Sequence, residues 1–421
     1  YEIAQCLVGS EMCIRDRAMS ENRFDFDTVI DRRGTNCGKW DTMDKKYGNT
    51  DLIHLGVADM DFPSPQPIRD VVHQCAEHGI FGYTDLGDDF YEGFMSWEKR
   101  MHHVDIKKEE IVFCPRINIS AGICVGAFTE PGEEVILHTP AYGPLYEAIS
   151  KNNRTVVKCG LKSQNGKYIM DLQQMEAQIT EKTKMLLLCS PHNPVGRVWT
   201  KEELEAVGEF CIKHELLLFV DEIHGDITAP GVEFVSALSL SEEVRKRLIV
   251  ASSPTKTFNI PGFILSYLII PNQEYRAVVK REIDRIGMHN PTIFSAAVAG
   301  CAYQQCDDWY KAMLSYIDEN DKFTRAYFAE KMPEFYIYPR EGTYLLWMDY
   351  KELGCEEAEL EKWFLEKAKV SVYMGTVFQE EGRGCIRLNI ASPRKLLEEA
   401  YDRMYVAYCL SLIHISEPTR H

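Results

Sequence analysis

The stretch Ala251-Ser-Ser-Pro-Thr-Lys-Thr-Phe-Asn-Ile-Pro-Gly262 places a single lysine, Lys256, shortly after the apolar run Leu248-Ile-Val-Ala251. That run is typical of a short buried strand. Hydroxyl and amide side chains flank the lysine, and no carboxylate neighbours it in the sequence. This setting favours an unprotonated, nucleophilic amine of the kind that forms a Schiff base. A surface lysine in a polar turn is the common alternative, so other stretches must supply the parts that a reactive lysine needs.

Short apolar runs rich in branched side chains alternate with helix-length segments from residue 111 onward. One such segment, 200–214, opens on Thr200, a residue type that caps helix N-termini. Strands that alternate with helices predict a mostly parallel sheet with helices on both faces. Ligands bind such sheets at the carboxyl ends of the strands, so the residues that follow the runs are the site candidates. The expected strands are 111–114, 134–138, 155–159, 184–190, 216–222 and 247–253.

The residues before this region predict a strand at 55–62 and a helix that starts near Pro67 and ends at His78. Gly79 and Gly82 then leave Tyr83 on a loop.

After residue 290 the pattern changes to that of a smaller α+β unit. A long helical region, 294–331, is followed by strand-like runs at 335–339, 342–350 and 384–391, with helices near 356–368 and 394–407. We therefore expect an N-terminal arm and small-domain segment at 19–55, a large domain at 56–292 and a small domain at 293–408.

Both ends of the chain differ in character from the rest. Residues 1–17 and the stretch from about Cys409 to His421 resemble translated sequencing-adapter read-through, and Met19 is expected to be the true start. We therefore set residues 1–18 and 409–421 aside as artefactual tails.

The composition excludes several classes of protein. The formal net charge of −17 disfavours a nucleic-acid or anionic-membrane surface. No apolar run approaches the ~20 residues of a membrane span. The 14 cysteines form neither a CxxC pair nor a Cys/His ligand cluster, which predicts no metal site and reduced thiols. We expect a cytoplasmic protein without a membrane or nucleic-acid partner.

Four strand ends carry polar side chains of one chemical theme: Tyr142 follows 134–138, Asn193 follows 184–190, Asp221 ends an apolar run, and Lys256 follows 247–253. Their order and spacing resemble the fold-type I pyridoxal-phosphate (PLP) enzymes, the class I/II aspartate-aminotransferase superfamily. The resemblance implies a large α/β domain with a mostly parallel seven-stranded sheet, a smaller α+β domain, and PLP as the cofactor.

The resemblance also assigns roles. Lys256 would bind the cofactor covalently, Asp221 would hold the pyridine nitrogen protonated, Asn193 would donate to the ring hydroxyl, and Tyr142 would stack on the ring. His224 is a further cofactor-binding candidate, and the candidates for the phosphate are Ile117, Asn118, Ser253 and Thr255. Arg387, together with Asn193, would bind the substrate α-carboxylate. Arg116 is unusual for the family and points either to the phosphate or to solvent. Taken alone, each residue also has an ordinary structural interpretation, such as a cap, a turn or a salt bridge.

The stretches GIFGYT, CSPHNPVGRVWT, DEIHGDI and EEGRGCIRLNIASPR together resemble the MalY/PatB group of cystathionine β-lyase-like C–S lyases. Aminotransferases often carry an arginine eight residues after the lysine and a tyrosine three after the aspartate; this chain has Ile264 and His224. Tyr83 matches a tyrosine with which the neighbouring subunit helps to hold the cofactor phosphate, so it is a further cofactor-binding candidate. The resemblance thus implies a homodimer with shared active sites.

The implied activity is β-elimination of L-cystathionine or related cysteine S-conjugates to a thiol (homocysteine), pyruvate and ammonia. Lys256, Tyr142 and Tyr83 are the catalytic candidates. An aminotransferase on the same scaffold, or a PLP-binding regulatory protein with little catalysis, are the alternatives. Pro254, the phosphate loop CPRINIS and residues 228–240 depart from the group's pattern.

Overall fold

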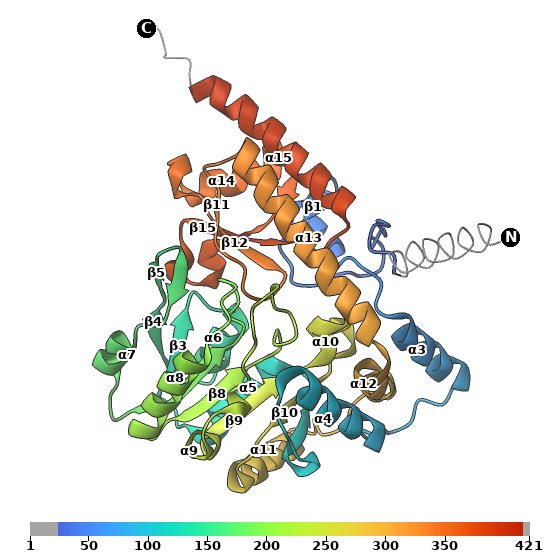
Figure 1. The fold of residues 1–421 in the computed structure, drawn as a ribbon, viewed down its shortest axis with the longest axis vertical. Coiled ribbons are helices and arrows are strands. Elements are labelled where there is room, and N and C mark those ends of the chain that lie inside the picture. The colour runs from blue at the N-terminus through green and yellow to red at the C-terminus, as the bar shows by residue number, and fades with distance from the viewer. Residues whose placement is uncertain (1–23, 416–421) are drawn as a thin grey trace, which may run out of the picture.

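The computed structural model describes residues 24–415 and the side chains of residues 24–410. The tail expected at 1–18 and residues 416–421 of the tail expected at 409–421 lie outside the described residues, whereas residues 409–415 continue the last helix, which ends at Ile415. A seven-stranded sheet forms the lower half of the molecule in Figure 1. Its order is β2-β10-β9-β8-β7-β3-β4, in which β10 alone runs antiparallel to both neighbours. The strands are β2 (Ile111–Cys114), β3 (Glu134–Thr139), β4 (Thr155–Gly160), β7 (Thr183–Cys189), β8 (Leu217–Asp221), β9 (Leu248–Ser252) and β10 (Ser266–Ile269).

Helices cover both faces of this sheet because successive side chains of each strand point to opposite sides. On β8, Leu218 and Val220 belong to one core cluster, whereas Leu217 and Phe219 belong to the other. The predicted doubly covered, mostly parallel α/β sheet is therefore confirmed. The helices of this part are α3 (Gln66–His78), α4 (Asp88–His102), α5 (Ile117–Phe128), α6 (Gly143–Ser150), α7 (Leu172–Gln178), α8 (Lys201–Lys213), α9 (Glu242–Arg245), α10 (Pro254–Thr257), α11 (Gln273–Arg285) and α12 (Ile293–Gln305).

Two predicted helix boundaries, the start of α8 and the end of α3, are confirmed, and a local cap decides each of them. Thr200 caps α8, since its hydroxyl accepts from the Glu203 backbone N–H while the Glu203 side chain accepts from the Thr200 N–H. Gly79 ends α3 in the left-handed conformation that glycine adopts at low cost. The long helical region expected at 294–331 is two helices, α12 and α13 (Asp307–Lys331), that meet at Cys306.

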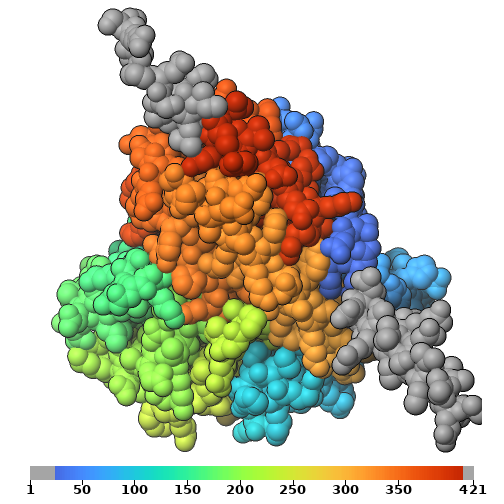
Figure 2. Space-filling model, turned by 45° about the horizontal axis from the view of Figure 1, so that its top comes forward, coloured from blue at the N-terminus to red at the C-terminus, as the bar shows by residue number. Residues whose placement is uncertain are grey.

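A four-stranded antiparallel sheet, order β11-β12-β15-β14, forms the second part (Figure 1). Figure 2 shows the C-terminal residues beside the N-terminal ones at this end of the molecule, and the short β1 pairs there in parallel with β13. The domain boundaries expected at 55, 292 and 408 stay predictions. Helix α12, which begins just after the expected boundary at 292, packs against α3 and α4. The remaining elements are α2 (Asp41–Tyr47), β1 (Ile53–His54), the hairpin β5 (Lys162–Gln164) and β6 (Lys167–Ile169), α13 (Asp307–Lys331), β11 (Tyr336–Ile337), β12 (Leu345–Asp349), α14 (Glu357–Trp363), β13 (Val370–Ser371), β14 (Tyr373–Met374), β15 (Cys385–Asn389) and α15 (Arg394–Ile415).

The segment 55–62, predicted to be a strand, is irregular. Its carbonyl oxygens accept hydrogen bonds from side chains: Arg387 donates to Gly56 at 2.7 Å, Asn389 donates to two further carbonyls at 2.7 Å each, and Lys256 donates to another. Because side chains occupy these acceptors, no neighbouring strand extends along the segment. The prediction was wrong, and the segment instead lines the functional site with backbone oxygens.

Among residues 24–415, no helix combines the length and the apolar character needed to cross a bilayer.

Candidate active site

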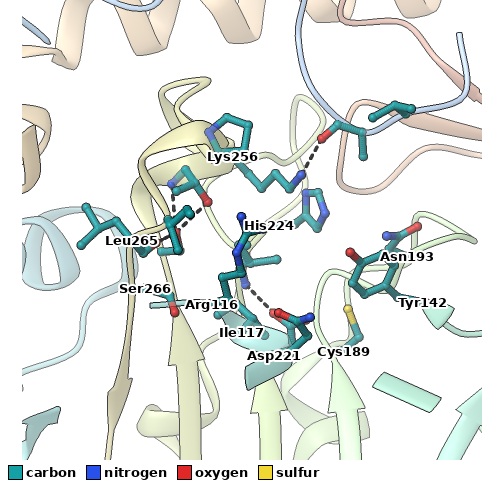
Figure 3. A pocket seen from close by; sticks show the side chains of 18 of the residues that line it. Arg116, Ile117, Tyr142, Cys189, Asn193, Asp221, His224, Lys256, Leu265 and Ser266 are labelled. Carbon is teal, nitrogen blue, oxygen red and sulfur yellow. Dashed lines mark hydrogen bonds between the residues drawn. The ribbon is translucent and has the colours of Figure 1, made fainter. Parts of the chain in front are cut away.

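A pocket lies at the carboxyl ends of β7, β8 and β9 (Figure 3), and residues of the small sheet line its other side. The first turns of α5 and α10 and residues of β14 and β15 complete its wall. The structure therefore brings together segments that lie far apart in the sequence. The predicted site residues that line the pocket are Ile117, Asn118, Tyr142, Asn193, Asp221, His224, Ser253, Thr255, Lys256 and Arg387.

Lys256 lies on the short helix α10, directly after β9, and its side chain extends into the pocket (Figure 3). Its ammonium donates to the carbonyl oxygen of Ala58. Enclosure by the pocket walls lowers the pKa of Lys256 to about 8, although the negative charge of Asp59 opposes the shift. The amine is therefore available as a nucleophile and base at a pH where most lysines are protonated.

Asp221 ends β8 and is almost completely buried. One carboxylate oxygen accepts from the Ile223 N–H at 3.1 Å, and no cationic side chain among residues 24–410 forms an ion pair with the carboxylate. Burial raises the pKa of Asp221 to about 6. A buried carboxylate of this kind is stabilised by a ligand that brings a positive charge or a hydrogen-bond donor.

Arg387 lies on β15, opposite Tyr373 of β14, and is 2% exposed. Its guanidinium donates to Asn193 Oδ1 at 2.8 Å and to the Gly56 carbonyl at 2.7 Å, and it lies 4.7 Å from the Phe378 ring centroid. Burial lowers the pKa of Arg387 to about 10, and no acidic residue in the described part of the chain pairs with it. A buried guanidinium without a counter-charge is suited to bind a carboxylate from a ligand.

The hydrogen bond from Arg387 also determines how Asn193 can act. Because Asn193 Oδ1 accepts this bond, the amide nitrogen is left to donate into the pocket.

His224 is 2% exposed, and its Nδ1 has no partner among the described residues. Burial and the nearby charge of Lys256 hold the pKa of His224 well below the usual range. A neutral His224 can therefore donate to a ligand or accept from it.

Tyr83 is the exception among the predicted site residues. It lies on the loop between α3 and α4, is fully exposed, and does not line the pocket of its own chain. Its predicted role requires a second copy of the chain.

The class I and II aminotransferase family model matches residues 50–404. The chain belongs to this family. It is 34% identical to "Protein MalY" of Escherichia coli, covering 89% of this chain and 96% of that protein, and 32% identical to "Cystathionine beta-lyase PatB" of Bacillus subtilis, covering 91% and 99%. The crystal structure of cystalysin from Treponema denticola, which contains pyridoxal 5'-phosphate, superposes with a TM-score of 0.89 at 31% identity, over 92% of this chain and 99% of that one.

The pocket residues fit PLP, the cofactor that the family resemblance implies. The amine of Lys256 can bind an aldehyde, the unpaired carboxylate of Asp221 can bind a protonated pyridine nitrogen, and the free amide nitrogen of Asn193 can bind a ring oxygen. The unpartnered Nδ1 of His224 supplies a further polar contact. When bound, PLP withdraws electrons from the α-carbon of an amino acid.

Several pocket residues had escaped the sequence analysis. Tyr373 enters the pocket because β14 pairs with β15 and sets it opposite Arg387. Ala58 enters through the irregular segment, and Cys189 ends β7. Only Cys189 had a sequence signal, namely its place at the end of an apolar run.

A cluster of buried ionisable groups lies behind Lys256. The Asp226 carboxylate accepts from Trp97 Nε1 at 2.8 Å, pairs with His102 Nε2 at 2.8 Å, and accepts from the Thr257 hydroxyl at 2.5 Å. Burial opposes the charge of His102, but the charges of Glu98 and Asp226 outweigh it and raise the pKa of His102 to about 9. The hydrogen bonds of Asp226 thus connect α4 to α10, the helical turn that carries Lys256.

We expect Asp226→Asn to lower the free energy of unfolding by about 3 kcal/mol at pH 7, because it removes the carboxylate that is hydrogen-bonded to the buried His102 charge and leaves only the attraction of Glu98. The folded pKa of His102 is raised, so the contribution of the pair is complete below about pH 6.5 and declines as the pH rises through about 9. Urea unfolding at pH 6 and pH 9.5 measures both effects. Asp105→Asn is the control, since its pair with Lys99 is exposed and worth under ~1 kcal/mol. A loss as small as that of the control would show that His102 is neutral.

The pKa of Lys256 predicts how the reactivity of its amine depends on pH. In cofactor-free protein, trinitrobenzenesulfonate should label Lys256 half-maximally near pH 8, since only the neutral amine reacts. Peptide mass spectrometry of the 256-containing fragment measures the labelling. Lys151, which is exposed on the surface, is the internal reference. Equal profiles for the two lysines would contradict the pKa shift.

Proposed function

We propose that the chain is a PLP-dependent C–S β-lyase that cleaves L-cystathionine or related cysteine S-conjugates to a thiol, pyruvate and ammonia. The observation that carries the proposal is the buried, unpaired guanidinium of Arg387 in the same pocket as the low-pKa amine of Lys256. One binds an α-carboxylate and the other reacts at the neighbouring carbon. The similarity to PatB and MalY supports elimination as the reaction type.

The chain's residues have distinct tasks in this reaction. Arg387 and Asn193 orient the substrate carboxylate, and Asp221 keeps the pyridine nitrogen of the cofactor protonated. The Lys256 amine takes the proton from the substrate α-carbon. Tyr142, at the N-terminus of α6, lies on the pocket wall, where its ring can cover the cofactor face.

Elimination then breaks the bond between the β-carbon and sulfur. The electron pair of the α-carbon forms the Cα–Cβ double bond, and the sulfur leaves with the bonding pair as a thiolate. The proton held by Lys256 neutralises this thiolate, with Tyr142 or the partner subunit's Tyr83 as helper. The released enamine takes up water and yields pyruvate and ammonia, so that L-cystathionine and one water give homocysteine, pyruvate and ammonia.

The test is a product assay on the protein with PLP and L-cystathionine, with the cofactor-free protein as the blank. Thiol and pyruvate should appear in equal amounts. A shift of the cofactor spectrum to the pyridoxamine form without pyruvate would establish an aminotransferase. Cofactor binding without either change would support the regulatory alternative.

We further propose a homodimer with active sites shared between subunits. The loop between α3 and α4 presents Ile80, Phe81 and Tyr83 to solvent, with exposed fractions of 68%, 61% and 104%. Adjacent exposed apolar side chains of this kind are typical of an interaction surface. A two-fold partner would bury this loop and bring Tyr83 to the neighbouring pocket.

Mixing two defective variants tests the shared site. Lys256→Ala and Tyr83→Ala subunits should regain up to about a quarter of native activity after exchange, because half of the dimers are mixed and each has one intact site. Mixing Lys256→Ala with Asp221→Ala is the control, since both residues line the pocket of one chain. No recovery in the first mixture after proven exchange would exclude a role for Tyr83 across the interface.

For the location we propose the cytoplasm. The cysteines that the structure describes are all free, and most are buried. Unpaired thiols in such number are typical of reducing compartments.

A further inference from the structure

The negative charge of a cofactor phosphate must be balanced by groups that line the pocket. A phosphate monoester carries about two negative charges at neutral pH and needs cationic or N–H donors around it. Three cationic side chains line the pocket: Lys256, Arg387 and Arg116. Lys256 serves the aldehyde of the cofactor, and Arg387 donates to Asn193 and Gly56 at the other end. Only Arg116 is uncommitted.

The hydroxyl groups of Ser253 and Thr255, which were expected to bind the phosphate, and that of Ser266, which also lines the pocket, already donate hydrogen bonds within the protein. Ser253 Oγ donates to the Leu265 carbonyl at 2.6 Å, so its contact with Thr255 Oγ1 at 2.7 Å uses the hydrogen of Thr255. Ser266 Oγ donates to the Cys114 carbonyl. These three side chains therefore have no O–H left for a phosphate in this arrangement.

Arg116 lies at the start of α5, where the first N–H groups have no partner within the helix. Its backbone is extended, its carbonyl accepts from the Ser120 N–H at 2.9 Å, and its side chain projects into the pocket (Figure 3). The guanidinium has no hydrogen bond or ion pair with any residue from 24 to 410. The guanidinium of Arg116, which has no partner among these residues, therefore lies close to the N–H groups at the N-terminus of α5.

Ile264 lies on the same side of the pocket, because β10 begins at Ser266, which pairs with Cys114, two residues before Arg116. It lines the pocket with a φ of +54°, an unusual backbone conformation for a β-branched residue, and contributes an apolar side chain. Ile264 therefore brings no charge to offset a phosphate, and the cationic side chain that lines this side of the pocket is Arg116.

We propose that Arg116 is the phosphate-binding cation of the cofactor site and acts with the N-terminal N–H groups of α5. The guanidinium donates two parallel hydrogen bonds to phosphate oxygens, as this group does with planar and tetrahedral anions. The inference rests on the same PLP site as the proposed function, but it concerns cofactor affinity rather than turnover.

The experiment compares PLP with pyridoxal, which lacks the phosphate, in absorbance titrations of the cofactor-free protein. Arg116→Gln should raise the Kd of PLP about 10- to 100-fold and change that of pyridoxal less than about 3-fold, because a charge-assisted hydrogen bond is lost only with the phosphate. Arg116→Lys keeps the charge and should lie in between. Arg281→Gln, at an exposed arginine on α11, is the matched control and should change neither.

Two outcomes would overturn the proposal. Equal weakening of PLP and pyridoxal would make Arg116 a structural residue. Unchanged PLP affinity, together with a raised KM for L-cystathionine but not for an S-alkylcysteine without the distal carboxylate, would make it a substrate-binding residue. Because the titrations need no turnover, a failed lyase assay leaves the proposal intact, and a failed titration leaves the lyase activity intact.

Discussion

Replacing Lys256 by alanine should lower kcat/KM for thiol release from L-cystathionine by at least about 10³-fold, since it removes the group that binds the cofactor and moves the α-proton. The substitution removes an amine that has a pKa of about 8 and donates a hydrogen bond to the Ala58 carbonyl in the pocket. Initial rates of thiol and pyruvate formation measure the effect. The absorbance of bound cofactor provides an independent readout, because covalent binding is lost as well.

A matched control for this variant is Lys246→Ala, at an exposed lysine whose partner is Glu243 on the surface. It should retain native activity. If Lys256→Ala kept more than a tenth of the native rate with the cofactor bound, the base would have to be another residue, and Tyr142 would be the next to test.

Replacing Arg387 by alanine should lower kcat/KM by about 100-fold or more, because loss of a buried charge-assisted contact costs about 2–5 kcal/mol. Most of the effect should appear in KM, since the guanidinium binds the carboxylate in ground state and transition state alike. Arg387→Lys should recover little, because an ammonium cannot donate in the paired geometry and its buried charge is poorly hydrated. Saturation kinetics with L-cystathionine measure kcat and KM separately.

Arg383→Lys is the control for Arg387, since Arg383 lies just ahead of β15, is exposed, and pairs with Glu380 on the surface. Its kinetics should equal those of the native protein. An unchanged KM in Arg387→Ala would show that the carboxylate binds elsewhere, and the pocket would then need a different substrate pose.

The sequence predicted much of the fold because its main determinant is local. Each of the six apolar runs became a strand of the large sheet, and Thr200 capped its helix as expected. The strand β10 was not identified, since an antiparallel strand between neighbours has no crossover helix to mark it. The segment 55–62 was predicted wrongly, because an apolar run does not reveal which side chains will occupy its carbonyl groups.

Within the site, the sequence by itself determined the residues at strand ends: Lys256, Asp221 and Asn193 come after apolar runs, and parallel strands bring such ends to one edge. Only the tertiary structure decided that Arg387 is buried without a counter-charge and that Arg116 is uncommitted. The physical reason is that contacts between segments far apart in the sequence decide whether a side chain has a hydrogen-bond partner. The bond from Arg387 to the Gly56 carbonyl is one such contact. A local sequence pattern determines the position of a residue in a strand or turn, whereas tertiary packing determines which of its polar groups remain free to bind a ligand.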